Sequence, residues 1–483
     1  MNTLNTLALF VDFGSTFTKA VLVDLRHPSI LSHAQAPTTA DTDVTRGLAQ
    51  ALRALNVNRG DWENANHKLA CSSAAGGLGL VASGLVEELT SKAATMAALA
   101  AGAKVLGTYS HELTTEDIRS IERKKPDIIL LAGGTDGGNR QLVLHNANAI
   151  AHSGVKASVI VAGNREVVPQ ALDLLASHGK NAHGVENVMP RVGELNVQPV
   201  QEVIRELFTK CITHAKGLDK AERVLDSVVM PTPEAVMRAA EVLSHGTDAE
   251  KGWGNIVVID VGGATTDLYS VAAGRAKNSE AVVRGLPEPV AKRTIEASAG
   301  VRASALQILH KVGKKAFLEQ ATDIFVNAHS SSRFSHDELL HTVEAFANHP
   351  QQLPASTLAE VADLTLGRLA CRLGITSHAG RMSRVITPEG VRYVQEGKDL
   401  RGIRRVIGTG GVISHSANPG LALSGALMQK GEDMTLAPEE AVFYVDRSYM
   451  LFAAGLLASI NEDASLRMMK RYIICQGERH DMQ

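Results

Sequence analysis

The sequence is poor in cysteine and in aromatic residues, and it carries almost no excess charge. Its four cysteines lie far apart in the 483-residue chain and form no C-x-x-C pair, which argues against a disulfide framework or a zinc site. Lys and Arg total 49 and Asp and Glu total 51, so the net charge is −2. Nucleic acid as the main partner would need a basic field. We therefore expect no nucleic acid partner.

Long hydrophobic runs are also missing. The longest, Met450 to Ile460, is too short to span a bilayer, and no basic N-terminal region precedes an apolar stretch with a cleavage site. We expect a cytoplasmic protein with no membrane partner. A chain of 483 residues exceeds one hydrophobic core, which predicts about two or three domains.

Strand and helix patterns alternate through the first half of the chain. Short apolar runs such as Asp127–Ala132 and Ser158–Ala162 are each followed by a helical pattern, at Asn139–His152 and Glu166–Ser177. A further helix is expected over Ser91–Val105, which is rich in alanine. This alternation predicts an α/β fold with a parallel sheet.

One pattern occurs twice, as "VDFGSTFTK" (Val11–Lys19) and "IDVGGATTD" (Ile259–Asp267). In each copy an apolar strand ends with an aspartate, Asp12 or Asp260, and a turn of small residues follows. A charged residue stands seven positions after the aspartate, as Lys19 or Asp267. The pattern predicts two hairpins of the same design.

Such a hairpin suits a nucleotide triphosphate with its Mg²⁺. Free turn amides bind phosphate oxygens, and glycine lets the backbone approach them. We expect Asp12 and Asp260 to face Mg²⁺ through its waters and Lys19 to reach a phosphate. Asp267 could orient a lysine or a water, or cap the next segment. The expected phosphate-binding residues are Gly14, Ser15, Thr16, Gly262, Gly263, Thr265 and Thr266.

A third glycine-rich segment follows the second copy. The strand Arg405–Ile407 leads into Gly408, Thr409, Gly410 and Gly411, where side chains are too small to collide with a nucleoside. We expect this segment to bind the adenosine of ATP.

These three motifs, in this order, resemble the two phosphate motifs and the adenosine motif of the actin, sugar kinase and heat-shock ATPase superfamily. The apolar helix around Ala453-Ala454-Gly455 resembles that superfamily's later connecting helix. The resemblance implies a two-lobed actin-like (ribonuclease H-like) α/β fold with an inserted α/β region. We place the first ATPase subdomain at 1–68, the insert at 69–250 and the second lobe at 251–483.

A narrower resemblance covers nearly the whole chain. The segments "CSSAAGGLGLVASGLVEELTSKAA", "ILLAGGTDGGN", "VIVAGN", "AKRTIEASAGVR" and "VIGTGGVISHS" are similar to the glutamate mutase L family. That resemblance implies an ATP-dependent reactivating factor for adenosylcobalamin-dependent glutamate mutase (methylaspartate mutase), with the mutase subunits as partners and self-assembly left open. The family reads more like "EGDLG" after "KRT", whereas this chain has Glu296-Ala297-Ser298-Ala299-Gly300.

Several alternatives stay open. A weak ATPase, a small-molecule kinase and a nucleotide-binding scaffold without turnover share the same motifs. The loop "AGGTDGGNR" (Ala132–Arg140) fits either an anion site at a helix N-terminus or a turn capped by Asp136. "GLGLVA" (Gly77–Ala82) formally matches a dinucleotide motif, but no helix follows at once and no acid stands at the expected distance. The cobalamin signature D-x-H-x-x-G is absent from the sequence.

Overall fold

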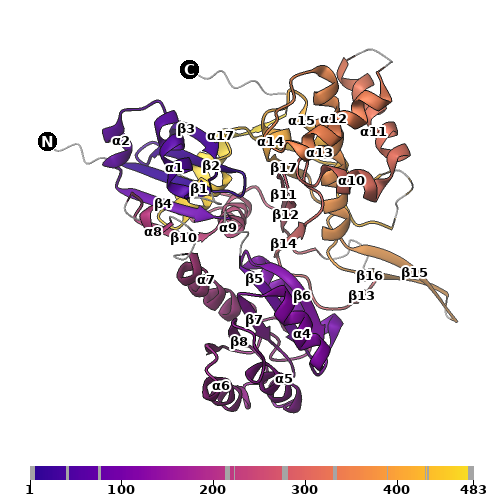
Figure 1. Ribbon diagram of the computed structural model, residues 1–483. Coiled ribbons are helices and arrows are strands. Elements are labelled where there is room, and N and C mark those ends of the chain that lie inside the picture. Colours follow the sequence, from indigo (N-terminus) through magenta and orange to yellow (C-terminus); the bar gives the residue numbers. More distant parts are fainter. Residues whose placement is uncertain are drawn as a thin grey trace. The chain divides into compact units, whose positions relative to one another are not determined.

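The computed structural model describes residues 6–39, 43–73, 78–212, 218–221, 224–274, 281–329, 334–388, 390–429, 431 and 434–476 (Figure 1). The chain divides into two compact units. Unit 1 holds residues 1–235 with 285–287, and unit 2 holds residues 236–284 with 288–483. Each unit is described by itself below.

The first sheet of unit 1 has five strands in the order β10-β4-β1-β2-β3. β1 and β2 form an antiparallel hairpin, β2 pairs antiparallel with β3, and β4 runs parallel to both β1 and β10. β1 is central and buried almost throughout because its residues are nearly all apolar. The bounds are β1 Leu7–Phe13, β2 Phe17–Asp24, β3 Ser29–Pro37, β4 His67–Ser72 and β10 Ser227–Pro231.

Helix α1 packs on this sheet, and helix α9 follows its strand β10 in the chain. α1 (Val44–Ala54) begins at Asp43, whose side chain accepts the Thr45 amide, and its apolar face packs on β2 and β3. α9 (Thr232–His245) follows β10 directly and begins in unit 1. The short α2 (Arg59–Glu63) packs near β1.

A second, all-parallel sheet lies between β4 and β10 in the chain, in the order β6-β5-β7-β8-β9. Its strands are connected through helices, as expected for doubly wound sheets. The strands are β5 Gly79–Gly84, β6 Lys104–Ser110, β7 Ile128–Leu131, β8 Ser158–Val161 and β9 Ala182–Gly184. The helices are a π-helix at Glu87–Ser91, α3 Lys92–Ala100, α4 Thr115–Lys124, α5 Gln141–Ala151, α6 Val168–Ser177, α7 Gln198–Ile212 and α8 Leu218–Ala221.

The main sheet of unit 2 has the order β14-β12-β11-β17-β18-β19. β11 and β12 form an antiparallel hairpin, β12 pairs antiparallel with β14, and β11, β17 and β18 run parallel. α13 (Thr357–His378) packs on β11, β12 and β14. The strands are β11 Ile256–Val261, β12 Thr266–Val271, β14 Ala291–Glu296, β17 Arg405–Thr409, β18 Val442–Asp446 and β19 Ile473–Cys475.

Further helices complete unit 2. α16 is buried along its whole length, as its uninterrupted apolar sequence requires. The helices are α10 Ala305–Val312, α11 Lys314–His329, α12 His336–Asn348, α14 Gly411–Ser414, α15 Pro419–Leu423, a 3-10 turn at Ser424–Ala426, α16 Leu451–Ala458 and α17 Glu462–Tyr472. A separate three-stranded sheet joins β13 Val282–Arg284, β16 Gly390–Glu396 and β15 Arg381–Thr387.

The two main sheets share one topology. Counted in chain order, the sheet of unit 1 and the first five strands of the sheet of unit 2 both read third, second, first, fourth, fifth, with the first three antiparallel and the fourth and fifth parallel to the first. Unit 2 adds β19, antiparallel to β18, as a sixth strand. This repeated order confirms the predicted mixed α/β fold class of the actin-like type. The predicted domain limits stay a prediction. None of the helices in the described ranges is long and apolar enough to cross a membrane.

Candidate functional site

The first predicted hairpin is formed by β1 and β2. Asp12 lies opposite Lys19 in the register, and the Lys19 Nζ is 3.7 Å from Asp12 Oδ2. The turn closes through a hydrogen bond from the Gly14 amide to the Phe17 carbonyl. A Cβ on Gly14 would lie 2.6 Å from that carbonyl oxygen, so the turn requires glycine. Ser15 and Thr16 are exposed at its tip.

The Asp12 carboxylate is buried, and its partners come from two other strands and one helix. Its Oδ1 accepts the Thr232 hydroxyl at 2.6 Å and the Cys71 thiol at 3.7 Å. Burial raises the pKa of Asp12, and the Lys19 charge with the Thr232 hydrogen bond offsets part of that effect. Sequence reasoning missed Thr232 and Cys71. The only signal was Pro233 near a helix start, which marks Thr232 as the residue that begins the helix.

The second hairpin repeats this geometry in β11 and β12. Asp260 lies opposite Asp267, as Asp12 lies opposite Lys19. The Gly262 amide donates to the Thr265 carbonyl at 2.9 Å, the counterpart of the bond that closes the first turn. The parallel neighbours also correspond, because Cys71 of β4 stands beside Asp12 and Thr409 of β17 beside Asp260.

The segment after β14 braces this second turn. The amides of Val301 and Arg302 donate to the carbonyls of Gly262 and Gly263. Gly300 lies so close that a Cβ would approach the Ala264 backbone to 2.2 Å. The Thr266 hydroxyl donates to the Ala299 carbonyl, so its hydrogen is used inside the protein. The segment Glu296–Gly300, which departs from the family pattern, therefore has a structural role in holding the turn.

Asp267 is held by a buried arginine of β14. Both Nε and Nη2 of Arg293 donate to Asp267 Oδ1, at 2.9 and 2.6 Å, and the Thr265 hydroxyl also points to the carboxylate. Burial, with the Asp267 charge as a second cause, raises the pKa of the adjacent Tyr269. Arg293 is a residue that sequence reasoning missed, because nothing in "AKRTIE" indicates which carboxylate it pairs with.

The glycine segment Gly408–Gly411, at the end of β17, packs tightly on the second hairpin. Gly410 has φ 98°, and a Cβ there would lie 2.2 Å from the Val261 carbonyl oxygen. A Cβ on Gly408 would meet Leu423 at 2.7 Å. Gly411 begins α14 and has more space, since a Cβ would lie 3.2 Å from the Tyr449 hydroxyl. Small residues are therefore needed here for packing as well as for any ligand.

A further polar cluster surrounds this segment. Asp446, at the end of β18, accepts the amides of Met450 and Leu451 at the start of α16, and the Thr409 hydroxyl donates to it at 3.3 Å. Tyr449 has φ 51°, an uncommon backbone for a large side chain. Burial raises the pKa of Tyr449, with the charges of Asp260 and Asp446 as further causes. Sequence reasoning did not single out Asp446 or Tyr449.

The loop after β7 does not use Asp136 as a helix cap. The Asp136 carboxylate accepts the Arg165 amide and the Asn187 side-chain amide, both at 3.0 Å, so it joins three loops of the parallel sheet. The N-terminal turn of α5 is capped instead by Asn139, which accepts the Leu142 amide. Gly79 to Gly84 form β5, so the described part of "GLGLVA" lies within a strand rather than at a phosphate-binding turn. Gly77 lies outside the described residues.

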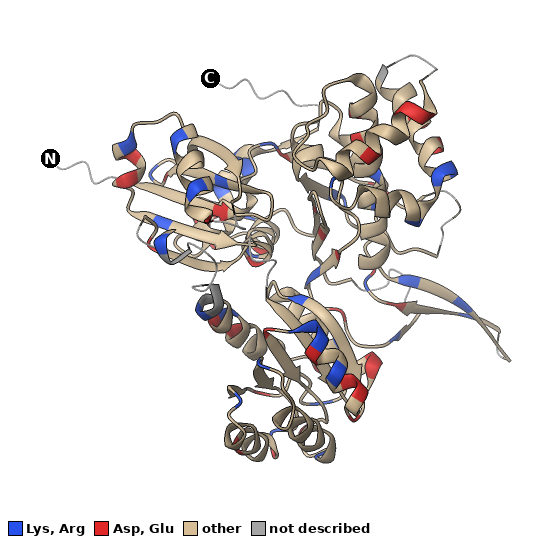
Figure 2. Ribbon diagram, viewed as in Figure 1, with Lys and Arg blue, Asp and Glu red and all other residues tan. Residues whose placement is uncertain are grey.

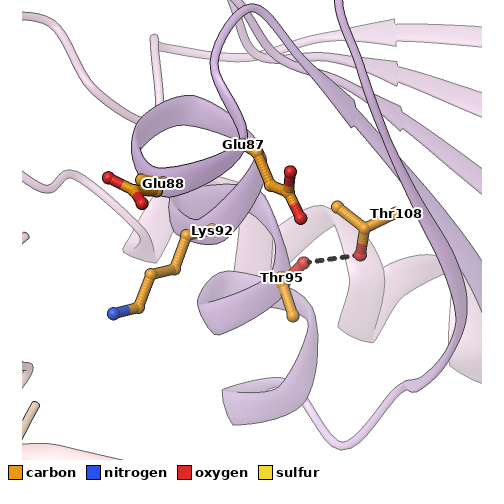
Figure 3. A pocket seen from close by; sticks show the side chains of 5 residues that line it. All are labelled: Glu87, Glu88, Lys92, Thr95 and Thr108. Carbon is orange, nitrogen blue, oxygen red and sulfur yellow. Dashed lines mark hydrogen bonds between the residues drawn. The ribbon is translucent and has the colours of Figure 1, made fainter. Parts of the chain in front are cut away.

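An open pocket of about 470 Å³ occurs elsewhere in unit 1, between α3 and β6 (Figure 3). Its lining residues are Glu87, Glu88, Lys92, Thr95 and Thr108. Thr95 and Thr108 are joined by a hydrogen bond of 3.2 Å across one side. Two carboxylates among five lining residues make this pocket unfavourable for phosphate, and none of the predicted nucleotide-binding residues lines it.

The residues present fit a magnesium ion of the kind that accompanies nucleotides. In the described ranges, no group of three or more His, Cys, Asp and Glu side chains could form a metal cage. Mg²⁺ in nucleotide sites needs only one or two carboxylates, with waters and phosphate oxygens completing its shell. Asp12 in unit 1 and Asp260 in unit 2 each stand near a strand end beside a turn, and each is a carboxylate of the kind that such an ion takes.

Comparison with known proteins gives a family for the whole chain. The family model described as MutL protein matches residues 8–473. The curated protein named Protein MutL from Clostridium tetanomorphum is 41% identical over 467 residues, covering 96% of this chain and 99% of that protein.

Solved structures with similar folds are much more distant. The activator of 2-hydroxyisocaproyl-CoA dehydratase from Clostridium difficile is 10% identical, with a TM-score of 0.30 and coverage of 96% of this chain and 97% of that chain. A glycerol dehydratase reactivase is 11% identical, with a TM-score of 0.31 and coverage of 94% and 99%. Xylulose kinase from Bifidobacterium adolescentis is 10% identical, with a TM-score of 0.30 and coverage of 98% and 95%.

Proposed function

The chain belongs to the MutL protein family, and we propose that it is an ATP-dependent accessory protein that reactivates adenosylcobalamin-dependent glutamate mutase. In this proposal, binding and hydrolysis of ATP drive the release of damaged cobalamin from the inactivated mutase. The mutase subunits are the partner, and ATP with Mg²⁺ is the ligand.

One observation carries the nucleotide part of the proposal. The two hairpins have the same register and the same turn hydrogen bond, and each has a carboxylate at the end of its first strand. If each aspartate only helped to form its turn, the second hairpin would not need the same arrangement as the first. Two matched copies, each with free turn amides and a carboxylate, support the binding of a polyphosphate with its cation.

We assign the roles as follows. The turn residues Gly14, Ser15 and Thr16, with Gly262, Gly263 and Thr265, bind phosphate oxygens through their amides and hydroxyls. Lys19 adds a positive charge, and Asp12 and Asp260 hold Mg²⁺, which when bound neutralises the charge that develops on the phosphates. The Gly408–Gly411 segment binds the adenosine.

In this proposal, Asp267 acts while it is paired with Arg293. The pair fixes the second strand of the hairpin opposite Asp260 and so sets the electrostatic field at that carboxylate. Water is the acceptor of the phosphoryl group in this proposal. The ATP-bound and ADP-bound forms must bind the mutase with different affinity, because a ligand shifts an equilibrium only through its differential affinity.

The test is phosphate release, measured with and without glutamate mutase that has been inactivated with hydroxocobalamin. We expect inactivated mutase to stimulate release and mutase activity to return on addition of fresh coenzyme. Asp12→Ala should abolish both. Turnover that requires a small metabolite and yields its phosphate ester would identify a kinase instead. Mg-ATP binding without phosphate release, even with mutase present, would identify a scaffold.

A further inference from the structure

The hairpin of β15 and β16 is unusual because apolar side chains are exposed on both faces of its sheet. With β13 it forms a three-stranded sheet that extends from the helical part of unit 2 (Figure 1). Val282, Val283, Val385, Ile386, Val391 and Tyr393 are exposed by 41 to 80%. Small sheets are stable in water only when one face packs against something else. The sheet therefore offers apolar surface that the described chain does not cover.

Beyond Met382, none of the residues that the structure describes pairs with the outer edge of β15. At its base, the Met382 amide donates to the Met434 carbonyl at 2.7 Å, on the side away from β16. Backbone groups of alternate residues point to the same side of a strand. Arg384 and Ile386 therefore direct their N–H and C=O groups to this outer edge, and among the described strands β15 pairs with β16 alone. Such an edge is a template for strand addition.

The charges on this sheet are mainly positive (Figure 2). Arg384 and Arg392 are exposed and lie within ion-pair distance of no described carboxylate. Glu396 lies at the base, where it pairs with Arg284 at 3.3 Å. Glu389, which stands between β15 and β16 in the sequence, lies outside the described residues. A strand added beside Arg384 would therefore be favoured by carboxylates at alternate positions.

A second copy of the chain is a poorer occupant than an acidic strand. Antiparallel pairing of two β15 edges about Val385 would place Arg384 of each copy diagonally across from Arg384 of the other. Diagonal neighbours in a sheet are about 7–8 Å apart, a distance at which two exposed like charges repel. The arginine thus opposes pairing between copies while it favours an acidic partner.

We propose that the outer edge of β15 is a docking site for an extended segment of another protein, in which apolar residues alternate with acidic ones. The segment adds as a strand beside Ser383–Thr387, with backbone bonds to Arg384 and Ile386. Its carboxylates pair with Arg384, and its apolar side chains lie on the opposite face of the sheet, beside Val385. This inference goes beyond the proposed function, because it requires neither nucleotide binding nor a cobalamin enzyme.

The first experiment selects binders from a displayed library of random octapeptides on the full-length protein. We expect the enriched peptides to alternate apolar and acidic residues and to contain no proline in their centre. Addition of an enriched peptide should slow amide hydrogen exchange in the segment 383–387 of the wild-type protein. Enrichment of basic peptides, or of none, would overturn the proposal. A dimer in sedimentation that Ile386→Pro abolishes would overturn it as well.

Matched variants then identify the edge. Ile386→Pro removes an outward N–H that the hairpin itself does not use, and proline is tolerated at such edge positions. It should weaken binding by about tenfold or more, whereas Ile386→Thr keeps the N–H and should weaken it less. Arg384→Glu should weaken the binding of acidic peptides by about tenfold. As a control, Lys156→Glu reverses an exposed charge in unit 1 and should weaken this binding by less than about twofold. Unchanged binding in Ile386→Pro would exclude strand addition, with circular dichroism showing that the variant is folded.

Discussion

Thr232, the first residue of α9, donates its hydroxyl hydrogen to Asp12 over 2.6 Å, although the two residues are 220 positions apart in the chain. The bond stabilises the charged form of a buried carboxylate. Thr232→Val should therefore lower the free energy of unfolding by about 1.5–3 kcal/mol at neutral pH, and Thr232→Ser should lower it far less. Urea denaturation measures both. Loss of stability in Thr232→Ser but not in Thr232→Val would show that the methyl group, rather than the hydroxyl, matters at this position.

The raised pKa of Asp12 predicts a pH dependence for nucleotide binding. A carboxyl group whose folded pKa is raised takes up a proton at higher pH than an ordinary aspartate, whose pKa is 3.8. Since Mg²⁺ needs the charged form, affinity for Mg-ATP should fall as the pH is lowered, beginning above the range of ordinary aspartates. Isothermal titration calorimetry between about pH 8 and pH 5 tests this, and an affinity that stays constant across that interval would contradict the prediction.

The same pKa shift has a consequence for stability with the opposite sense. Because the folded pKa of Asp12 exceeds the unfolded one, the ionised carboxylate lowers stability at pH values above its folded pKa, and protonation at lower pH removes this cost. Asp12→Asn should therefore unfold at an equal or higher temperature than the wild type near pH 7, while losing Mg-ATP binding. A clearly lower unfolding temperature at that pH would mean that the ion pair with Lys19 outweighs the cost of burial.

Asp260 and Asp267 lie opposite each other in the same hairpin but should respond differently to substitution. Asp267→Asn leaves the buried Arg293 without its ion-pair partner, which typically costs about 3–5 kcal/mol. Asp260 is only half-buried, so Asp260→Asn should change stability little and act mainly on Mg-ATP binding. Thermal unfolding and nucleotide titration of both variants distinguish these outcomes. Strong destabilisation by Asp260→Asn would assign that residue a structural role instead.

Adjacent glycines provide a second matched pair. In Gly410→Ala the new Cβ would lie 2.2 Å from the Val261 carbonyl, in a backbone conformation with φ 98°. Overpacking of this kind costs about 1–3 kcal/mol before the backbone strain is added. Gly411→Ala places its Cβ 3.2 Å from the Tyr449 hydroxyl, where a small shift relieves the contact. Unfolding midpoints should therefore fall clearly for the first variant and little for the second.

Lys398 predicts a pH effect in unit 2. Its buried ammonium group donates to the carbonyls of Pro289 and Val290, and burial lowers its pKa to about 7, with the charge of Lys292 as a further cause and Glu288 acting in the opposite direction. Since the folded pKa lies below the unfolded value of 10.5, the folded state binds fewer protons between those values, and stability should rise with pH across that interval. Lys398→Met should lack this rise. Unfolding of both proteins at about pH 7, 8 and 9 gives the comparison.

Local sequence was sufficient where one segment contains the whole signal. The hairpins around Gly14 and Gly262 were predicted because strand, aspartate and glycine turn lie within nine residues. Partner choice over long distances was not predictable in the same way. Nothing near Asp12 indicates that its neighbours are Cys71 and Thr232, since parallel pairing of β4 and β10 is decided by the fold as a whole.

The misjudged segments have physical reasons as well. The helix expected over Ser91–Val105 ends at Ala100, because Gly102 adopts φ 81° and the chain then enters β6. No prediction was made for β15, in which Arg381 and Arg384 interrupt the apolar residues, and Val385 and Ile386 face solvent rather than a core. In both segments, tertiary context decides between conformations that the local sequence allows about equally.

The thiol of Cys71 is buried beside Asp12, and burial, with the charge of Asp12 as a second cause, raises its pKa far above the usual range. A thiol reagent attacks only an accessible thiolate, so it can modify Cys71 only when the first sheet locally opens. The rate at which a reagent modifies Cys71 therefore reports how often the first sheet opens locally. Any ligand that stabilises the first hairpin should slow the modification of Cys71, whether or not the ligand is consumed in a reaction.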